Sequence, residues 1–76
     1  MRVTTVYASP EDVYVDLERN EARLSLEESR DMSLTPLARQ IALYRFESAT
    51  EYLISHLSGT ERAQWIATLY LATGRI

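Results

Sequence analysis

His56 is the only histidine of the chain, so it is the only side chain whose ordinary pKa lies near neutrality and the first candidate for acid–base chemistry. Its nearest candidate partners are Ser55 and Glu51. On a helix, adjacent residues point away from one another, and residues five apart are also poorly placed for contact. The pattern singles out no more distant Ser, Thr or Asp as a third member. We therefore predict no catalytic residue and no enzymatic activity.

Carboxylates offer a second kind of chemistry, the binding of a divalent cation. Glu47 and Glu51 are four apart, on one face of a helix, but hard cations require more oxygen ligands and a loop that delivers them. Three further acids do not match the spacing of a calcium-binding loop, which also needs a central glycine: Asp12, Asp16 and Glu18. The chain has no cysteine and a single histidine, so a zinc site is not expected either. We predict no metal and no cofactor.

Loops that bind phosphate depend on glycine, and the chain has only Gly59 and Gly74. A helix-turn-helix could be centred on the segment Ser58-Gly59-Thr60. Its second helix would have to present polar side chains to DNA bases, and it offers mainly Arg62 and Gln64 before it becomes apolar. The sequence thus carries no nucleotide-binding fingerprint and only a weak indication of a transcriptional regulator, which would be small and dimeric.

The charge of the chain is unevenly distributed. Its net charge is −3, and every basic residue is an arginine. The segment from Glu11 to Asp31 has eight carboxylates and three arginines, whereas the remainder, from Met32 onward, is close to neutral. General nucleic-acid binding needs clustered positive charge, so this distribution argues against it. An acidic mimic of nucleic acid remains an alternative, with Asp16, Glu18 and Glu27 in the basic groove of a target.

The length of 76 residues predicts one domain, residues 1–76. A domain of this size buries only about 60% of the surface of its unfolded chain, so its stability is marginal unless something supplements the core. Disulfides and thiolate metal sites are excluded by composition. A second chain is the remaining supplement, and we expect a homodimer.

The first third of the chain has the pattern of β structure. Residues 3–7 (VTTVY) are β-branched or aromatic and predict a strand. Ser9-Pro10-Glu11-Asp12 interrupts it, although Ser followed by Pro and two acids is also a favourable start for a helix. After that, apolar residues alternate with polar ones up to Leu26. This period of two indicates strands rather than a helix.

A hairpin accounts for that alternation when Asn20-Glu21 forms its two-residue tip. In this register Leu17 lies opposite Leu24 and Val15 opposite Leu26, so both apolar pairs occupy one face. The other face then carries an ion pair, Glu18 with Arg23. A shift by one residue destroys this agreement, which supports the register, while the absence of glycine at the tip weakens it.

The pattern changes to helical spacing from Leu34 onward. Thr35-Pro36 supplies an N-cap and a first-turn proline, and strong helix formers follow. The apolar stripe drifts around the helix near Phe46. Either one long helix is buried on two sides, or a second helix begins with Ser48 and Glu51 as a capping box. Residues 40–46 also alternate and could form a strand; we expect helical structure throughout, with a kink near 46–49.

The last segment is expected to be a helix from about Glu61 to Thr73. Ser58-Gly59-Thr60 separates it from the preceding one, and Gly74 suits the left-handed position after its end. The predicted fold is therefore α+β: a small antiparallel hairpin or three-stranded sheet over residues 2–27, packed against two or three helices over residues 36–73.

The predicted helices carry more apolar side chains than one stripe each can cover. Large exposed apolar patches mark interaction sites, and aromatic residues are their usual anchors. We expect a partner-binding surface that consists of Leu43, Tyr44, Tyr52, Ile54, Trp65 and Leu71.

The function expected from these observations is non-enzymatic. No apolar run approaches the length of a membrane span, and the N-terminus lacks the apolar region of a signal peptide, so a cytoplasmic location is expected. The chain would be a protein-binding or regulatory module that acts through its apolar helical surface. Small acidic proteins of this class include phage- or plasmid-type inhibitors of host proteins.

Overall fold

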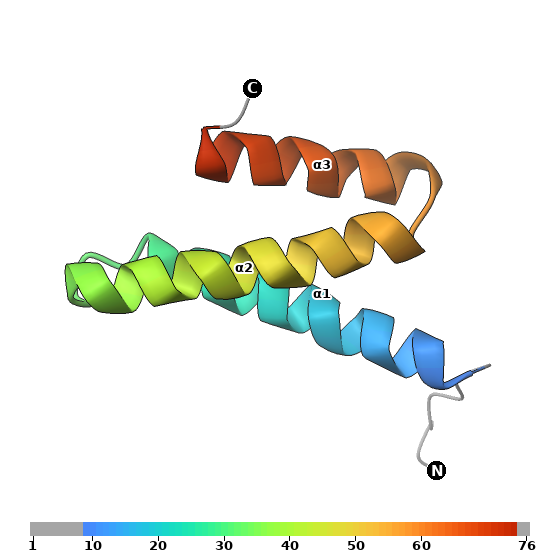
Figure 1. The fold of residues 1–76 in the computed structure, drawn as a ribbon, viewed down its shortest axis with the longest axis horizontal. Helices are drawn as coiled ribbons and strands as arrows, with labels where there is room; N and C mark the ends of the chain where they lie inside the picture. The colour runs from blue at the N-terminus through green and yellow to red at the C-terminus, as the bar shows by residue number, and fades with distance from the viewer. Residues whose placement is uncertain (1–8, 75–76) are drawn as a thin grey trace, which may run out of the picture.

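The computed structural model describes residues 9–74, and these residues form three helices (Figure 1). The helices are α1 (Pro10–Ser29), α2 (Pro36–His56) and α3 (Gly59–Thr73). α1 and α2 form an antiparallel hairpin, and α3 turns back along α2 on the side away from α1 in the view of Figure 1. Residues 9–74 contain no strand, so the predicted α+β fold is wrong for this part of the chain.

The residues of the predicted β-hairpin form the helix α1 instead. Ser9, Pro10 and the two acids act as a helix start, because the Ser9 hydroxyl accepts a hydrogen bond from the Asp12 amide and the acids lie in the first turn. The predicted tip, Asn20-Glu21, lies in the middle of this helix. The proposed strand at residues 3–7 lies outside the described residues.

The reason for the error is that the apolar positions of this segment also fit a helical period. Val15, Ala22 and Leu26 are seven and four residues apart and face the core, and Leu17 and Leu24 are seven apart on another face. The alternation covers only three apolar residues before it is interrupted by residues 19–22, which favour helix and contain no turn-forming glycine. When one helix carries two apolar stripes, the residues of the two stripes interleave in the sequence, and over a few residues this resembles the alternation of a strand.

α2 is a single helix of 21 residues, so residues 40–46 are not a strand and no new helix begins at Ser48. The apolar stripe drifts around α2 because this one long helix is buried on two sides, by α1 and by α3. Thr35 caps it as predicted, its hydroxyl accepting from the Ala38 amide at 3.1 Å. α3 ends at Gly74, whose φ of 71° is the left-handed value predicted for that position.

The core is small, and α2 supplies most of it. Seven hydrophobic residues are buried, three of them alanines: Val15, Ala22, Ala42, Phe46, Ala49, Leu53 and Leu69. Ser25 and Thr50 are buried as well, and each hydroxyl donates to a carbonyl oxygen of its own helix, one turn earlier. The small side chains allow α1 and α2 to approach closely, whereas α3 contributes only Leu69 to the fully buried set.

Candidate functional site

Two faces of the α1–α2 hairpin differ in what covers them. On one face, α3 contacts the hairpin through an Arg19–Glu61 ion pair and through Trp65 and Leu69. Arg19 and Leu26, the residues of α1 nearest α3, lie about 160° around the helix from Leu17 and Leu24, at 100° per residue. The opposite face of the hairpin is therefore not covered by α3.

Six large apolar side chains are exposed on that opposite face. We call this surface the open face, and it consists of Tyr14, Leu17 and Leu24 of α1 with Leu37, Ile41 and Tyr44 of α2. Spacings of three, four and seven place each trio on one stripe of its helix. A shallow cleft of about 370 Å³ between the helices connects the stripes, with Glu18 and Glu21 on one side and Ile41 and Tyr44 on the other.

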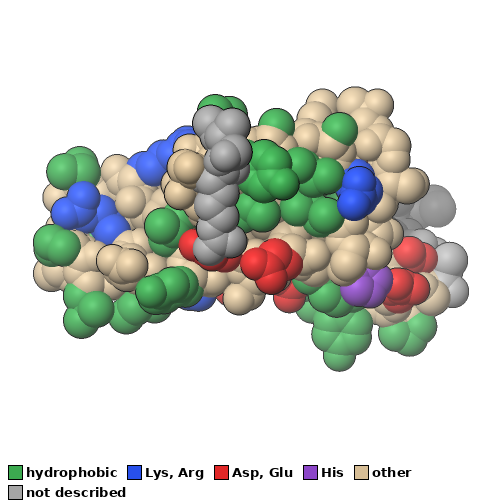
Figure 2. Space-filling model, turned by 45° about the horizontal axis from the view of Figure 1, so that its top comes forward, with side chains coloured by type: hydrophobic (Ala, Val, Ile, Leu, Met, Phe, Trp, Pro, Cys, Tyr) green, Lys and Arg blue, Asp and Glu red, His purple; other side chains and the backbone are tan. Residues whose placement is uncertain are grey.

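The area of the open face exceeds that of an ordinary surface patch. Each of the six residues is between 50% and 70% exposed. Taking about 200 Å² for a fully exposed large side chain, the six expose roughly 700 Å². The largest apolar patch of a typical monomer is about 300–600 Å², and a standard protein–protein interface takes about 800 Å² from each partner. Figure 2 shows hydrophobic side chains protruding along the lower edge of the molecule, away from the visible face.

Arg45 and two carboxylates fix the relation between the two stripes. The guanidinium of Arg45 contacts Glu21 and Glu28, which are about two turns apart on α1. A hydrogen bond from Arg45 to Glu21 is the main reason that the pKa of Arg45 is raised, so the guanidinium stays charged. These pairs are about 40% exposed and contribute little to stability, but they hold the two helices in register.

The charge around the open face is negative. α1 carries seven carboxylates against two arginines, and Glu18, Glu21 and Glu28 lie beside its apolar stripe. Of these three, Glu21 and Glu28 share one arginine, Arg45. The rim of the open face thus presents more negative charge than its own arginine neutralises.

The six residues predicted to bind a partner do not share one surface. Tyr44 lies on the open face, and Leu71 is 77% exposed on α3, which covers the other face. The other four are half-buried and pack against the core: Leu43, Tyr52, Ile54 and Trp65. Sequence reasoning missed most of the open face, because Tyr14, Leu17 and Leu24 had been placed on or near a hairpin strand.

The acids proposed to imitate nucleic acid also separate. Asp16 and Glu27 share one side of α1, and Asp16 forms an ion pair with Arg19. Glu18 lies about 160° to 180° from them, in the cleft of the open face. The helix therefore does not align these three carboxylates as a row of phosphates would be.

His56 lies at the end of α2 with both ring nitrogens close to polar groups. Its Nδ1 is 2.9 Å from the Tyr52 carbonyl oxygen and 3.0 Å from the Ser55 hydroxyl, and its Nε2 is 3.4 Å from Glu11. A carbonyl oxygen only accepts, so Nδ1 carries the proton and cannot take one from Ser55. The imidazole also stacks on Tyr52 at 4.0 Å. Serine and histidine do meet, contrary to prediction, but not as an activated nucleophile.

A second concave feature lies at the closed end of the hairpin, beneath the last turn of α3. This cavity of about 330 Å³ is lined by Leu26, Ser29, Arg30, Pro36, Arg39, Gln40, Leu43 and Ala72, and we call it the arginine cleft. Within it the Nε of Arg39 is shut off from solvent and has no hydrogen-bond acceptor. A buried donor without a partner costs about 1–3 kcal/mol. Among residues 9–74 no group of three or more acidic or histidine side chains is placed to hold a metal ion.

Comparisons of the chain with protein-family models, with curated proteins and with solved structures give no match. None of the helices formed by residues 9–74 has both the length and the apolar character needed to cross a bilayer. The open face is therefore the main indication of function in the described residues.

Proposed function

We propose that this protein is a non-enzymatic, cytoplasmic protein-binding module, and that its open face receives an amphipathic helix with basic flanks from a partner protein. The observation that carries the proposal is the extent of the open face, roughly 700 Å² of exposed apolar side chains on two rigid helices. Helices bind in such grooves through apolar anchors spaced three, four and seven residues apart. The stripes on α1 and α2 offer a complementary spacing.

The negative charge of Glu18, Glu21 and Glu28 beside the open face favours a partner with basic residues. Apolar anchors of the partner helix would lie between Leu17 and Ile41, and its lysines or arginines would face the carboxylates of α1. Complementary charge of this kind raises association rates and excludes partners with the wrong sign. A second copy of the chain would bring its own acidic α1 to the same surface. Charge thus favours a basic partner over the homodimer, although the area alone fits either.

Binding of this kind supports a regulatory or inhibitory role, because the partner's helix would be covered while it is bound. The acidic-mimic alternative has less support, since Glu18 points away from the side of α1 that Asp16 and Glu27 share. A DNA-reading role would rest on Arg62 of α3, but the Nε of Arg62 donates to the Ile54 carbonyl oxygen at 2.9 Å. Neither the acidic mimic nor a DNA-reading role accounts for the exposed apolar residues of the open face.

A pair of synthetic peptides tests the proposal directly. One is an amphipathic leucine–lysine helix, and the other replaces every lysine with glutamate. Fluorescence anisotropy should show saturable binding of the lysine peptide, at least about tenfold tighter than the glutamate peptide, and weakening as salt rises. Equal binding of the two peptides, or none of the lysine peptide, would contradict the assignment of a basic partner.

Substitutions then locate the binding surface. Leu17→Asn and Ile41→Asn remove anchors from the open face, and each should weaken binding of the lysine peptide by about tenfold or more. Leu71→Asn is the control, because Leu71 is even more exposed than Leu17 and Ile41 but lies on α3. Loss of binding in the control alone would move the site to α3. Sedimentation equilibrium without peptide tests the homodimer, and a dimer dissociated by Ile41→Asn would identify a second copy as the occupant.

A further inference from the structure

The arginine cleft is the second feature of this molecule with the chemistry of a binding site. Half of its lining is polar, from Ser29, Arg30, Arg39 and Gln40, and the other half is apolar. A volume of about 330 Å³ is at the small end of the range for ligand sites in proteins. It lies on the α3 side of the hairpin, so it is separate from the open face.

The two arginines of the cleft lack carboxylate partners. Neither Arg30 nor Arg39 forms an ion pair with a carboxylate of residues 9–74, whereas Arg19 and Arg45 each bridge two carboxylates. The nearby Asp31 accepts hydrogen bonds from the hydroxyl and amide of Ser33, and these lower its pKa. The charge of Arg39 lowers the pKa of Asp31 further, so the two side chains attract one another without a hydrogen bond between them. Arg23 and Arg62 also form no ion pair within residues 9–74, but only Arg30 and Arg39 lie together beside a cavity. In a chain of net charge −3, two guanidinium groups beside one cavity can bind an external anion.

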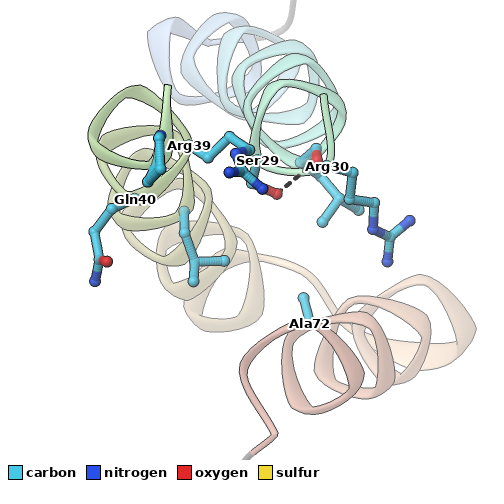
Figure 3. Close-up of a pocket in the computed structure, with 8 residues that line it drawn as sticks. Ser29, Arg30, Arg39, Gln40 and Ala72 are labelled. Carbon is cyan, nitrogen blue, oxygen red and sulfur yellow. Dashed lines mark hydrogen bonds between the residues drawn. The ribbon is translucent and has the colours of Figure 1, made fainter. Parts of the chain in front are cut away.

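Arg39 is the more informative of the two. Figure 3 shows its side chain reaching from α2 toward Ser29 at the end of α1, while Arg30 extends on the side of α3 and Gln40 points away from the cavity. Within residues 9–74, the Arg39 head makes one hydrogen-bond contact, from Nη1 to the sulfur of Met32, a weak acceptor, at 3.1 Å. Its Nε has none. Because the Nε has no acceptor and the Nη atoms are weakly held, the guanidinium can turn toward a carboxylate and bind it with two hydrogen bonds.

The apolar half of the lining indicates which chemical group the anionic ligand carries beside its charge. Leu26 and Leu43 belong to the apolar lining of the cleft, and Ala72 of α3 directs its methyl group into the gap (Figure 3). A bare inorganic anion would leave this apolar lining uncovered. A carboxylate on a short apolar chain covers it while its head group meets Arg39. We propose that the arginine cleft binds a carboxylate attached to a short apolar chain, with Arg39 and Arg30 on the carboxylate and Leu26, Leu43 and Ala72 around the chain.

Two sources carry this chemistry: a free aliphatic acid and the C-terminal carboxylate of a peptide that ends in an apolar residue. Octanoate and octanamide are the probes for the first, since they differ only in charge. N-acetylleucine and N-acetylleucinamide are the corresponding pair for the second. Calorimetry should show saturable binding of at least one acid, with its amide about tenfold weaker, the factor expected for loss of a charge-assisted hydrogen bond. The acid that binds identifies the source.

Arg39→Gln and Arg30→Gln should each weaken binding of the acid about tenfold, and nuclear magnetic resonance should show the Arg39 Nε–H signal shift on titration. Arg23→Gln is the matched control, because Arg23 is exposed on α1 and donates only to Asn20. Unfolding midpoints of all variants confirm that they fold. Equal binding of acid and amide, unchanged binding in the Arg39→Gln Arg30→Gln double variant, or tighter binding of inorganic phosphate than of octanoate would overturn the proposal. So would the absence of saturable binding of both acids.

Discussion

Arg19 of α1 and Glu61 of α3 form a two-point ion pair across 42 residues of sequence. The Nε of Arg19 lies 2.7 Å from Oε2 of Glu61, and Nη2 lies 2.8 Å from Oε1. The indole Nε1 of Trp65 also donates to Oε2 of Glu61, at 3.2 Å. Because only Leu69 of α3 is fully buried, this polar cluster supplies an important part of the contact that holds α3 on the hairpin.

Removal of the charge of Glu61 should therefore loosen α3. For Glu61→Gln we expect a loss of about 0.5–1 kcal/mol in the free energy of unfolding, because both side chains of the pair remain about one-third exposed. Amide exchange should accelerate in α3 more than in α1 or α2. Urea titration and hydrogen exchange measure the two effects. Uniform acceleration in all three helices would contradict a local role.

The same pair predicts the acid response of the protein. The Arg19 hydrogen bond is the main reason that the pKa of Glu61 is lowered in the folded state. A group with a lowered folded pKa stabilises the fold above its unfolded pKa, about 4.3 for Glu, and loses that contribution as pH falls through the folded value. The stability difference between wild type and Glu61→Gln should be constant above about pH 5 and shrink below about pH 4. Thermal unfolding across this range checks it, and a difference that grows on acidification would have the wrong sign.

Phe46 is the largest side chain that is fully buried, and it lies where the three helices meet. Phe46→Ala should cost about 3–5 kcal/mol, enough to unfold much of a domain this small. Phe46→Leu keeps most of the volume and should cost less than about 1.5 kcal/mol, so it remains measurable. Tyr44→Ala, on the exposed side of the same helix, should change stability by less than about 0.5 kcal/mol. Denaturant unfolding of the three variants provides the comparison.

Ala22 tests the helical assignment of residues 10–29. It is fully buried in the contact between α1 and α2, so Ala22→Leu should force the helices apart and cost about 1–3 kcal/mol. In the predicted hairpin this residue would have followed an exposed tip and would have tolerated leucine. Ala63→Leu, at an exposed position of α3, is the control and should change little. Equal stability of the two variants would favour the hairpin.

Local sequence signals predict where the helices in the second half of the chain begin and end. Thr35-Pro36, the break at Ser58-Gly59 and the end at Gly74 are local features, and capping and backbone freedom act over a few residues. The sequence also established the small size of the core and the excess of apolar side chains. The same local chemistry is present at Ser9-Pro10, but the alternation of apolar residues after it predicts strands. That prediction is wrong, because the capped helix α1 forms instead.

Only the tertiary structure decided which apolar residues are covered. Leu17 and Val15 are two residues apart and chemically similar, yet Val15 faces α2 and Leu17 is 55% exposed. The difference arises because Val15 points into the core between the helices, whereas Leu17 points to the side of the α1–α2 hairpin that α3 does not cover. The position of α3 depends on contacts such as Arg19 with Glu61 that no local pattern contains. The open face and the arginine cleft are both consequences of where α3 packs, and a single sequence does not encode that placement in its spacing.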